Sequence, residues 1–222
     1  SFLCEKAHSV YKYCDGAGAY VRAHGILMTV AWAAVIPCGV FFACFKNSFA
    51  ALAENGLWFK LHRAVQMLGV VLACAGFAVI VIGYKKAKMK HFVLTHARVG
   101  LAVVVLAILQ PLNAFVRPHK PGPDDVHAHP HSGWRTAWEV FHKKTGYGVL
   151  MLSWSNILLA FDLVEFQLDS YEGLRHALEA AFFTLAGAWL VAGYTCSVRK
   201  WRGAQRRRPG ATDDDKLEPL LI

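Results

Sequence analysis

Five apolar segments, separated by polar or charged stretches, dominate the sequence. The first four run Ala23–Phe45, Leu61–Tyr84, Ala97–Val116 and Thr145–Phe161, and the fifth covers roughly residues 176–196. A helix of about 20 residues, rising about 1.5 Å per residue, crosses a hydrocarbon core of about 30 Å. The pattern therefore predicts an all-α fold, a polytopic membrane bundle of five transmembrane helices.

The same pattern divides the chain into four parts. Residues 1–22 form a polar lead-in, and residues 23–161 hold the four helices of the expected core. Residues 162–198 comprise a connecting loop and the fifth transmembrane helix. Residues 199–222 form a tail that is first basic and then acidic.

The placement of charge predicts the topology. The chain is 55% hydrophobic with a net charge of +9, and its basic residues flank the apolar segments. Such flanking charge indicates membrane topology rather than nucleic-acid binding. Five crossings put the termini on opposite sides, called here side A (the N-terminal side) and side B. Lys and Arg are more numerous near side B, which predicts an integral, multi-pass membrane protein with a cytoplasmic C-terminus.

A histidine lies at or near the start of each of the first four segments: His24, His62, His96 and His142. Because successive helices run in opposite directions, these starts alternate between the two sides. His24 and His96 therefore fall near side A, and His62 and His142 near side B. Two imidazoles that face each other across a bundle suit the two axial positions of a b-type haem iron. The sequence thus predicts two haems b, forming a two-haem core within the first four helices.

Glycines follow the histidines at helical spacing. Gly100 and Gly146 each lie four residues after a histidine and so share its helix face. A glycine there leaves room for a flat macrocycle. Gly69 and Gly76 are expected to continue the face of His62 in the same way.

Two amide side chains recur at a second fixed interval. Gln110 follows His96 by fourteen residues, and Asn156 follows His142 by the same interval. Fourteen residues span about 21 Å of helix and return nearly to the same face. Each amide should therefore lie near the depth of the other histidine pair, where it can hydrogen-bond a haem propionate or a ligand histidine.

Other interpretations of the histidines fit less well. A zinc site favours closely spaced ligands and a third or fourth donor, and a proton relay would need carboxylates inside the segments. His176 begins the fifth segment without a partner segment and is expected at the membrane interface. The loop with His119, His127, His129 and His131 is either a metal-binding loop or a proline-rich connector.

Four stretches together resemble the cytochrome b561 family, in particular the membrane core of its DOMON-linked, ferric-chelate-reductase-like branch. They are HGILMTVAW (24–32), LWFKLHRAVQ (57–66), HARVGLAVVVLAILQPLNAFVRP (96–118) and WEVFHKKTGYGVLMLSWSNI (138–157). The resemblance implies two haems b, held by His24 with His96 and by His62 with His142. It also implies electron transfer from a cytoplasmic reductant, commonly ascorbate, to monodehydroascorbate or a ferric chelate on the opposite side.

Cations near each pair are the expected contacts of anions. Near side B, Arg63 is expected to bind the haem, and Lys60, Arg135 and Lys143 an anionic donor. Near side A, Lys85 and Lys86 are expected to receive an anionic acceptor. For each of these residues, contact with lipid headgroups is the competing interpretation.

A second class of function stays open on the sequence alone. The protein could be an accessory or structural haem-binding subunit of a larger membrane complex. A DOMON domain has no counterpart in these residues, and a DOMON-type partner or a homodimer is compatible with the resemblance. An enzymatic role would be that of a transmembrane oxidoreductase.

Overall fold

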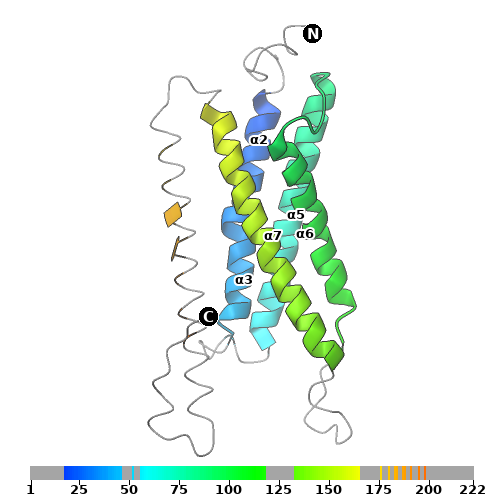
Figure 1. Cartoon of the computed structure of the whole chain (residues 1–222), viewed down its shortest axis with the longest axis vertical. Helices are drawn as coiled ribbons and strands as arrows, with labels where there is room; N and C mark the ends of the chain where they lie inside the picture. Colours follow the sequence, from blue (N-terminus) through cyan, green and yellow to red (C-terminus); the bar gives the residue numbers. More distant parts are fainter. Residues whose placement is uncertain are drawn as a thin grey trace, which may run out of the picture.

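The computed structural model describes residues 18–46, 52, 56–118 and 133–165, with isolated positions between 176 and 198. Four long helical stretches run side by side along the longest axis of the molecule (Figure 1). The predicted lead-in up to residue 17, the histidine-containing loop 119–132, most of the fifth predicted segment and the tail lie outside the described residues.

The helices follow the predicted segments, and each begins before its segment does. The first comprises α2 (Gly18–Thr29), a π-helical stretch η1 (Val30–Val35) and α3 (Ile36–Cys44). The others are α5 (Leu57–Lys86), α6 (Thr95–Phe115) and α7 (Gly133–Glu165). The first helix packs along α5 and α6 packs along α7, while further contacts join α5 to α6 and α7 to η1.

Three of these helices are long and apolar enough to cross a membrane: Gly18–Cys44, Leu57–Lys86 and Thr95–Phe115. They correspond to the first three predicted segments. The fourth predicted segment lies inside α7. This helix carries two polar residues, Ser153 and Asn156, that are buried in the bundle. Its crossing of the membrane remains a prediction, as does the fifth helix.

The interface between the first helix and α5 is built on small residues. Gly69, Ala73, Gly76 and Gly83 of α5 are all buried. A Cβ on Gly69 would collide with the Cγ1 atom of Ile36, and one on Gly76 would lie 3.2 Å from the Cβ of Leu27. Close approach of backbones through small residues is typical of helix pairs in membranes. Gly69 and Gly76 therefore receive side chains of the first helix.

Most of the buried residues between the helices are apolar. The buried cluster includes Trp32, Ala73, Val103, Leu150 and Trp154. By contrast, many large apolar side chains point outward, among them Leu68, Val71, Val105, Leu109 and Leu112. An outward apolar surface is what lipid requires, because the bilayer core offers no water to solvate polar groups.

The π-helical stretch η1 has a specific partner. The indole Nε1–H of Trp154 on α7 donates a hydrogen bond of 3.0 Å to the backbone carbonyl of Trp32. Both tryptophans are buried, with 4% and 8% exposure for Trp32 and Trp154. In a π-helical turn the backbone hydrogen bonds join residues five apart, so the carbonyl groups point differently from those of an α-helix. The buried indole thereby finds an acceptor that ties the first helix to α7.

Candidate functional site

The alternating direction of the helices brings the histidine-bearing segments together in pairs. The start of α6 lies beside α2 at one end of the bundle, and the starts of α5 and α7 lie at the other end (Figure 1). At the first end, the rings of His24 and His96 have centroids 6.2 Å apart and are nearly perpendicular, at 86°. At the other end, His62 and His142 are near enough to interact electrostatically. The two predicted pairings are therefore brought together.

Three of the four imidazoles are oriented by the same kind of hydrogen bond. Nδ1 of His24 lies 2.9 Å from the carbonyl oxygen of Gly76. Nδ1 of His62 lies 2.8 Å from that of Gly39, and Nδ1 of His96 lies 3.0 Å from that of Asn156. A carbonyl oxygen can only accept, so Nδ1 must carry the proton in each ring. The other nitrogen, Nε2, then keeps the lone pair that binds a metal.

His142 differs from these three histidines. Its Nδ1 atom is buried and has no hydrogen-bond partner among the described residues. Its ring instead lies flat against the indole of Trp138, with centroids 5.1 Å apart and planes 7° apart. Trp138 is one helical turn earlier on α7, and its own Nε1–H donates to the carbonyl of Asn113 over 3.0 Å. The fourth imidazole is thus held by an aromatic face.

The predicted amides lie at the predicted depths. Asn156, from the far part of α7, accepts the hydrogen bond of His96 with its backbone carbonyl. Its side-chain Nδ2 would lie 3.1 Å from a Cβ on Gly100, and its Oδ1 is buried without a partner in the described part of the chain. At the opposite end, Gln110 donates from Nε2 to Thr145 Oγ1 over 2.7 Å. Thr145 lies three residues after His142.

Gly146 lies on the same side of α7 as this contact. A Cβ on Gly146 would come no nearer than 3.9 Å to its surroundings, where it would meet Gln110 Oε1. The backbone therefore stays accessible next to His142. Gly100 is more tightly enclosed, because the amide of Asn156 already approaches it.

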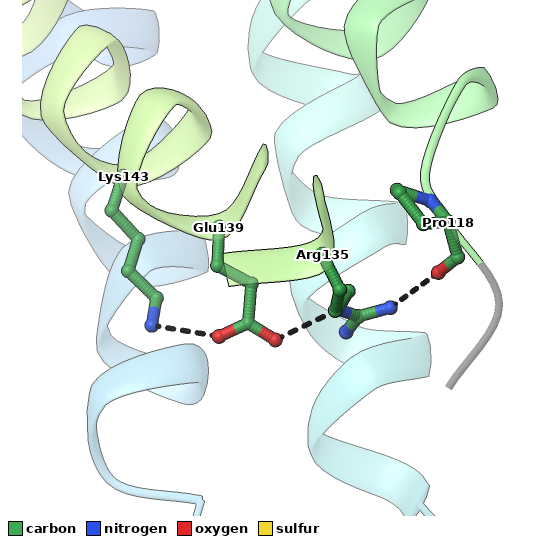
Figure 2. Close-up of polar contacts among 4 residues, drawn as sticks. All are labelled: Pro118, Arg135, Glu139 and Lys143. Atoms are coloured by element: carbon green, nitrogen blue, oxygen red, sulfur yellow. Dashed lines mark hydrogen bonds and ion pairs between the residues drawn. The ribbon is translucent and has the colours of Figure 1, made fainter. Parts of the chain in front are cut away.

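The cations predicted near side B are arranged in two ways. Figure 2 shows Arg135 and Lys143 converging on Glu139, with N···O distances of 2.9 Å and 3.4 Å. Arg135 also donates from Nη1 to the carbonyl of Pro118 over 2.6 Å, and its side chain is only 12% exposed. Arg135 is therefore already engaged with protein groups. Lys60 is exposed, and the guanidinium of Arg63 lies 5.7 Å from the ring of Phe59.

Arg117 is a cation at this end to which the sequence interpretation gave no role in the site. Its guanidinium lies 4.8 Å from the ring centroid of Phe59 and 5.9 Å from that of Trp138. Burial lowers the pKa of Arg117 from its usual value, the charge of Arg135 lowers it further, and Glu139 acts in the opposite direction. Two aromatic rings hold this cation, and one of them, Trp138, is the residue that stacks on His142. In the sequence, Arg117 and Pro118 follow an apolar segment and indicated only where that helix ends.

At side A, the two predicted lysines differ. Lys85 is exposed, whereas Lys86 donates from Nζ to the hydroxyl of Tyr20 over 2.9 Å and lies 5.4 Å from its ring. The Nε of Arg98, two residues after His96, donates to the carbonyl of Phe92 over 3.0 Å. Phe92 has a left-handed backbone, with φ of 58°. These contacts join the α5–α6 loop to the end of the bundle that carries His24.

The donor set suits haem better than a chelated metal ion. Within the described ranges, His, Cys, Asp and Glu nowhere gather in a group of three or more that could hold a metal. Pairs of imidazoles are what the axial positions of a haem iron require. With metal–nitrogen bonds of about 2 Å, two imidazoles on opposite faces of one iron have ring centroids roughly 6 Å apart. The His24–His96 separation of 6.2 Å matches that requirement.

The chain matches a protein-family model described as eukaryotic cytochrome b561, over residues 23–167. This range contains all four histidines, both predicted amides and Arg117.

Similar curated proteins agree with that match. A cytochrome b561 and DOMON domain-containing protein of Arabidopsis thaliana is 32% identical over 154 residues, which is 68% of this chain and 34% of the relative. A second Arabidopsis protein of that description is 25% identical over 91% of this chain and 47% of its own length. Human ferric-chelate reductase 1 is 37% identical over 106 residues, or 46% of this chain and 18% of the relative. The chain thus spans less than half the length of each of these relatives.

Proposed function

The chain belongs to the eukaryotic cytochrome b561 family, and on that premise we propose that it transfers electrons across a membrane through two b-type haems. His24 and His96 would hold one haem at side A, and His62 and His142 the other at side B. The carrying observation is the repeated hydrogen bond from Nδ1 to a carbonyl of a neighbouring helix. In His24, His62 and His96 this bond fixes the ring and leaves the lone pair of Nε2 for a metal.

A bound haem iron supplies reversible one-electron chemistry. The protein contributes the positions of the ligands and the medium between them. With two histidine ligands at each site, the iron would have no position for oxygen, and electrons would enter and leave through the edge of the site. Gly100 and Gly146 would accommodate the macrocycles, and Asn156 and Gln110 would hydrogen-bond groups at side A and side B respectively.

Buried apolar side chains lie between the two pairs. On the first helix, Trp32 lies midway between His24 and Gly39, whose carbonyl marks the depth of His62. Val103 of α6 and Leu150 of α7 lie at matching intermediate positions, and all three side chains are 4% exposed or less. A packed interior excludes water and small oxidants from the path. This arrangement supports direct electron transfer from one site to the other.

The donor in this proposal is an anionic cytoplasmic reductant such as ascorbate, docking at side B. Arg117, Lys60 and Lys143 provide positive charge there, and Arg63 is assigned to a haem propionate. At side A, Lys85 and Lys86 would attract an anionic acceptor. Monodehydroascorbate and a ferric chelate are the proposed acceptors, the latter supported by relatives named ferric-chelate reductase. A DOMON-type partner and a homodimer are further proposals.

Haem content tests the cofactor part of this proposal. The purified full chain should show a b-type difference spectrum on dithionite reduction and contain two haems per chain by pyridine haemochromogen analysis. His62→Ala and His142→Ala should each lose the same single haem, and His24→Ala and His96→Ala the other. Retention of both haems in His62→Ala would contradict the pairing.

Vesicle experiments test the transfer part. Chain inserted in liposomes that enclose an impermeant ferric chelate should reduce it when ascorbate is added outside. Liposomes carrying His62→Ala are the matched control, because they retain the membrane protein and lack the entry site. A loaded protein that ascorbate reduces without any reduction inside would favour the accessory haem-binding role over a complete transmembrane carrier.

A further inference from the structure

The side B pair is asymmetric. His62 donates from Nδ1 to the carbonyl of Gly39 over 2.8 Å. The Nδ1 atom of His142 is buried without a partner in the described part of the structure. At side A both histidines make the carbonyl hydrogen bond. Of the four imidazoles, His142 is therefore the one that no backbone acceptor among the described residues orients.

Trp138 supplies that orientation. The two rings are parallel within 7° at a centroid separation of 5.1 Å. The indole is itself fixed, because its Nε1–H donates to Asn113 O at the end of α6 over 3.0 Å. Stacking on a fixed aromatic face restricts rotation of the imidazole about its side chain. The contact with Trp138 thus orients the His142 ring, as a hydrogen bond to a carbonyl orients each of the other three rings.

The charged groups near the histidine pairs also differ between side A and side B. Lys143 and Arg117 both interact electrostatically with His142. The guanidinium of Arg117 contacts the rings of Phe59 and Trp138, at 4.8 Å and 5.9 Å from their centroids. No comparable cation among the described residues acts on His24 or His96. The carboxylate of Glu139 makes its ion pairs with Arg135 and Lys143, and its charge also acts on Arg117.

Both differences act in the same direction on an iron at side B. A hydrogen bond from Nδ1 to a carbonyl makes an imidazole a stronger electron donor and favours the oxidised metal. Within the described ranges, His142 makes no such bond. A nearby cation disfavours the more positive, oxidised state of the metal and favours the reduced state. A site with a weaker donor and added positive charge is easier to reduce.

We propose that Trp138 positions His142 by ring stacking in place of a backbone hydrogen bond, and that Arg117 raises the reduction potential of the side B haem alone. The inference rests on the proposed pair of haems and adds two residues that tune one of them. A raised potential at the entry site lets a mild anionic reductant load it with an electron. The same guanidinium, held near the surface, attracts that anion.

Potentiometric titration of the purified, haem-loaded full chain tests the role of Arg117. The transition that is missing in His62→Ala identifies the side B haem. Arg117→Gln should shift that transition to lower potential and leave the other transition in place. Arg98→Gln is the matched control, because it removes a cation near His96 and should not lower the side B transition. If Arg117→Gln moved both transitions equally, or neither, this role would be refuted.

Electron paramagnetic resonance tests the role of Trp138, because the spectrum of a low-spin haem depends on the orientation of its axial imidazoles. Trp138→Phe keeps a stacked ring and should preserve the side B signal. Trp138→Leu should change that signal or release the side B haem alone. An unchanged signal in Trp138→Leu, or the loss of both haems, would show that the stacking does not position His142. A wild-type chain with fewer than two haems would instead refute the proposed function itself.

Discussion

The backbone carbonyl of Asn156 accepts the hydrogen bond of His96 over 3.0 Å, although 60 residues separate the two in the chain. The contact links the first turn of α6 to the far half of α7. It also places the Asn156 amide next to Gly100, one turn after His96. One short segment of α7 therefore orients an imidazole and encloses the glycine beside it.

Gly100→Ala should disturb the side A site. The added methyl carbon would lie 3.1 Å from Asn156 Nδ2, tighter than an ordinary contact, so the amide would have to move. Movement of Asn156 would disturb the carbonyl that holds His96. We expect weaker binding of the side A haem, measured as the loss of one haem in the purified protein. Gly148→Ala is the control, because its Cβ would meet nothing within 4 Å. Equal haem content in the two variants would contradict the expectation.

Trp154→Phe should destabilise the protein by about 1–3 kcal/mol, the usual cost of leaving a buried hydrogen-bonding group unsatisfied. The substitution leaves the carbonyl of Trp32, inside the π-helical stretch, without its indole donor. Thermal unfolding in detergent would measure the effect as a lowered Tm. Trp134→Phe makes the same chemical change at a residue that is 69% exposed and should leave the Tm unchanged.

Gly69→Ala should destabilise the contact between the first helix and α5. The new methyl group would overlap Ile36, and overpacking of this kind costs typically about 1–3 kcal/mol. Ile36→Ala removes the side-chain atoms that Gly69 accommodates. The double variant should therefore be more stable than the sum of the two single effects predicts. Strict additivity in a thermal-unfolding cycle would mean that the two positions do not share this contact.

The Arg135–Glu139 ion pair should give a small, pH-dependent stabilisation. The hydrogen bond from Arg135 lowers the pKa of the Glu139 carboxyl, partial burial opposes this, and the charge of Lys143 lowers the pKa further. A lowered carboxyl pKa stabilises the folded state above the unfolded pKa of about 4.3. The stabilisation is lost as the pH falls through the folded value.

Because the Glu139 side chain is 40% exposed, solvent screening limits the contribution of this pair to about 1 kcal/mol or less. The difference in Tm between the unaltered chain and Glu139→Gln should be constant from pH 7 to about 5 and should shrink in more acidic buffer. A difference that grew on acidification would contradict the assigned direction of the pKa shift.

The sequence alone determined the main structural frame. The lengths of the apolar segments predicted the first three membrane-spanning helices. The thickness of the hydrocarbon core sets how many helical residues are needed to cross it. The alternation of helix direction then paired His24 with His96 and His62 with His142. Every second helix runs in the same direction, so the starts of those helices lie on the same side of the membrane. The interval of fourteen residues placed Gln110 and Asn156 at the correct depths because the helical rise is constant.

Only the tertiary structure decided which atoms meet. The inward direction of the polar residues Ser153 and Asn156 on α7 was visible only in the packing of the helices. The helical spacing of Gly69 and Gly76 fitted either a cofactor or a helix, and the position of Ile36 and Leu27 decided for the helix.

The difference between His142 and the other three histidines had no sequence signal. Its environment comes from Trp138 on α7, Asn113 and Arg117 near the end of α6, and Phe59 on α5. Periodicity assigns a residue to a face of its own helix. The partner across that face is set by how neighbouring helices pack, and this packing gives four similar histidines two different kinds of support.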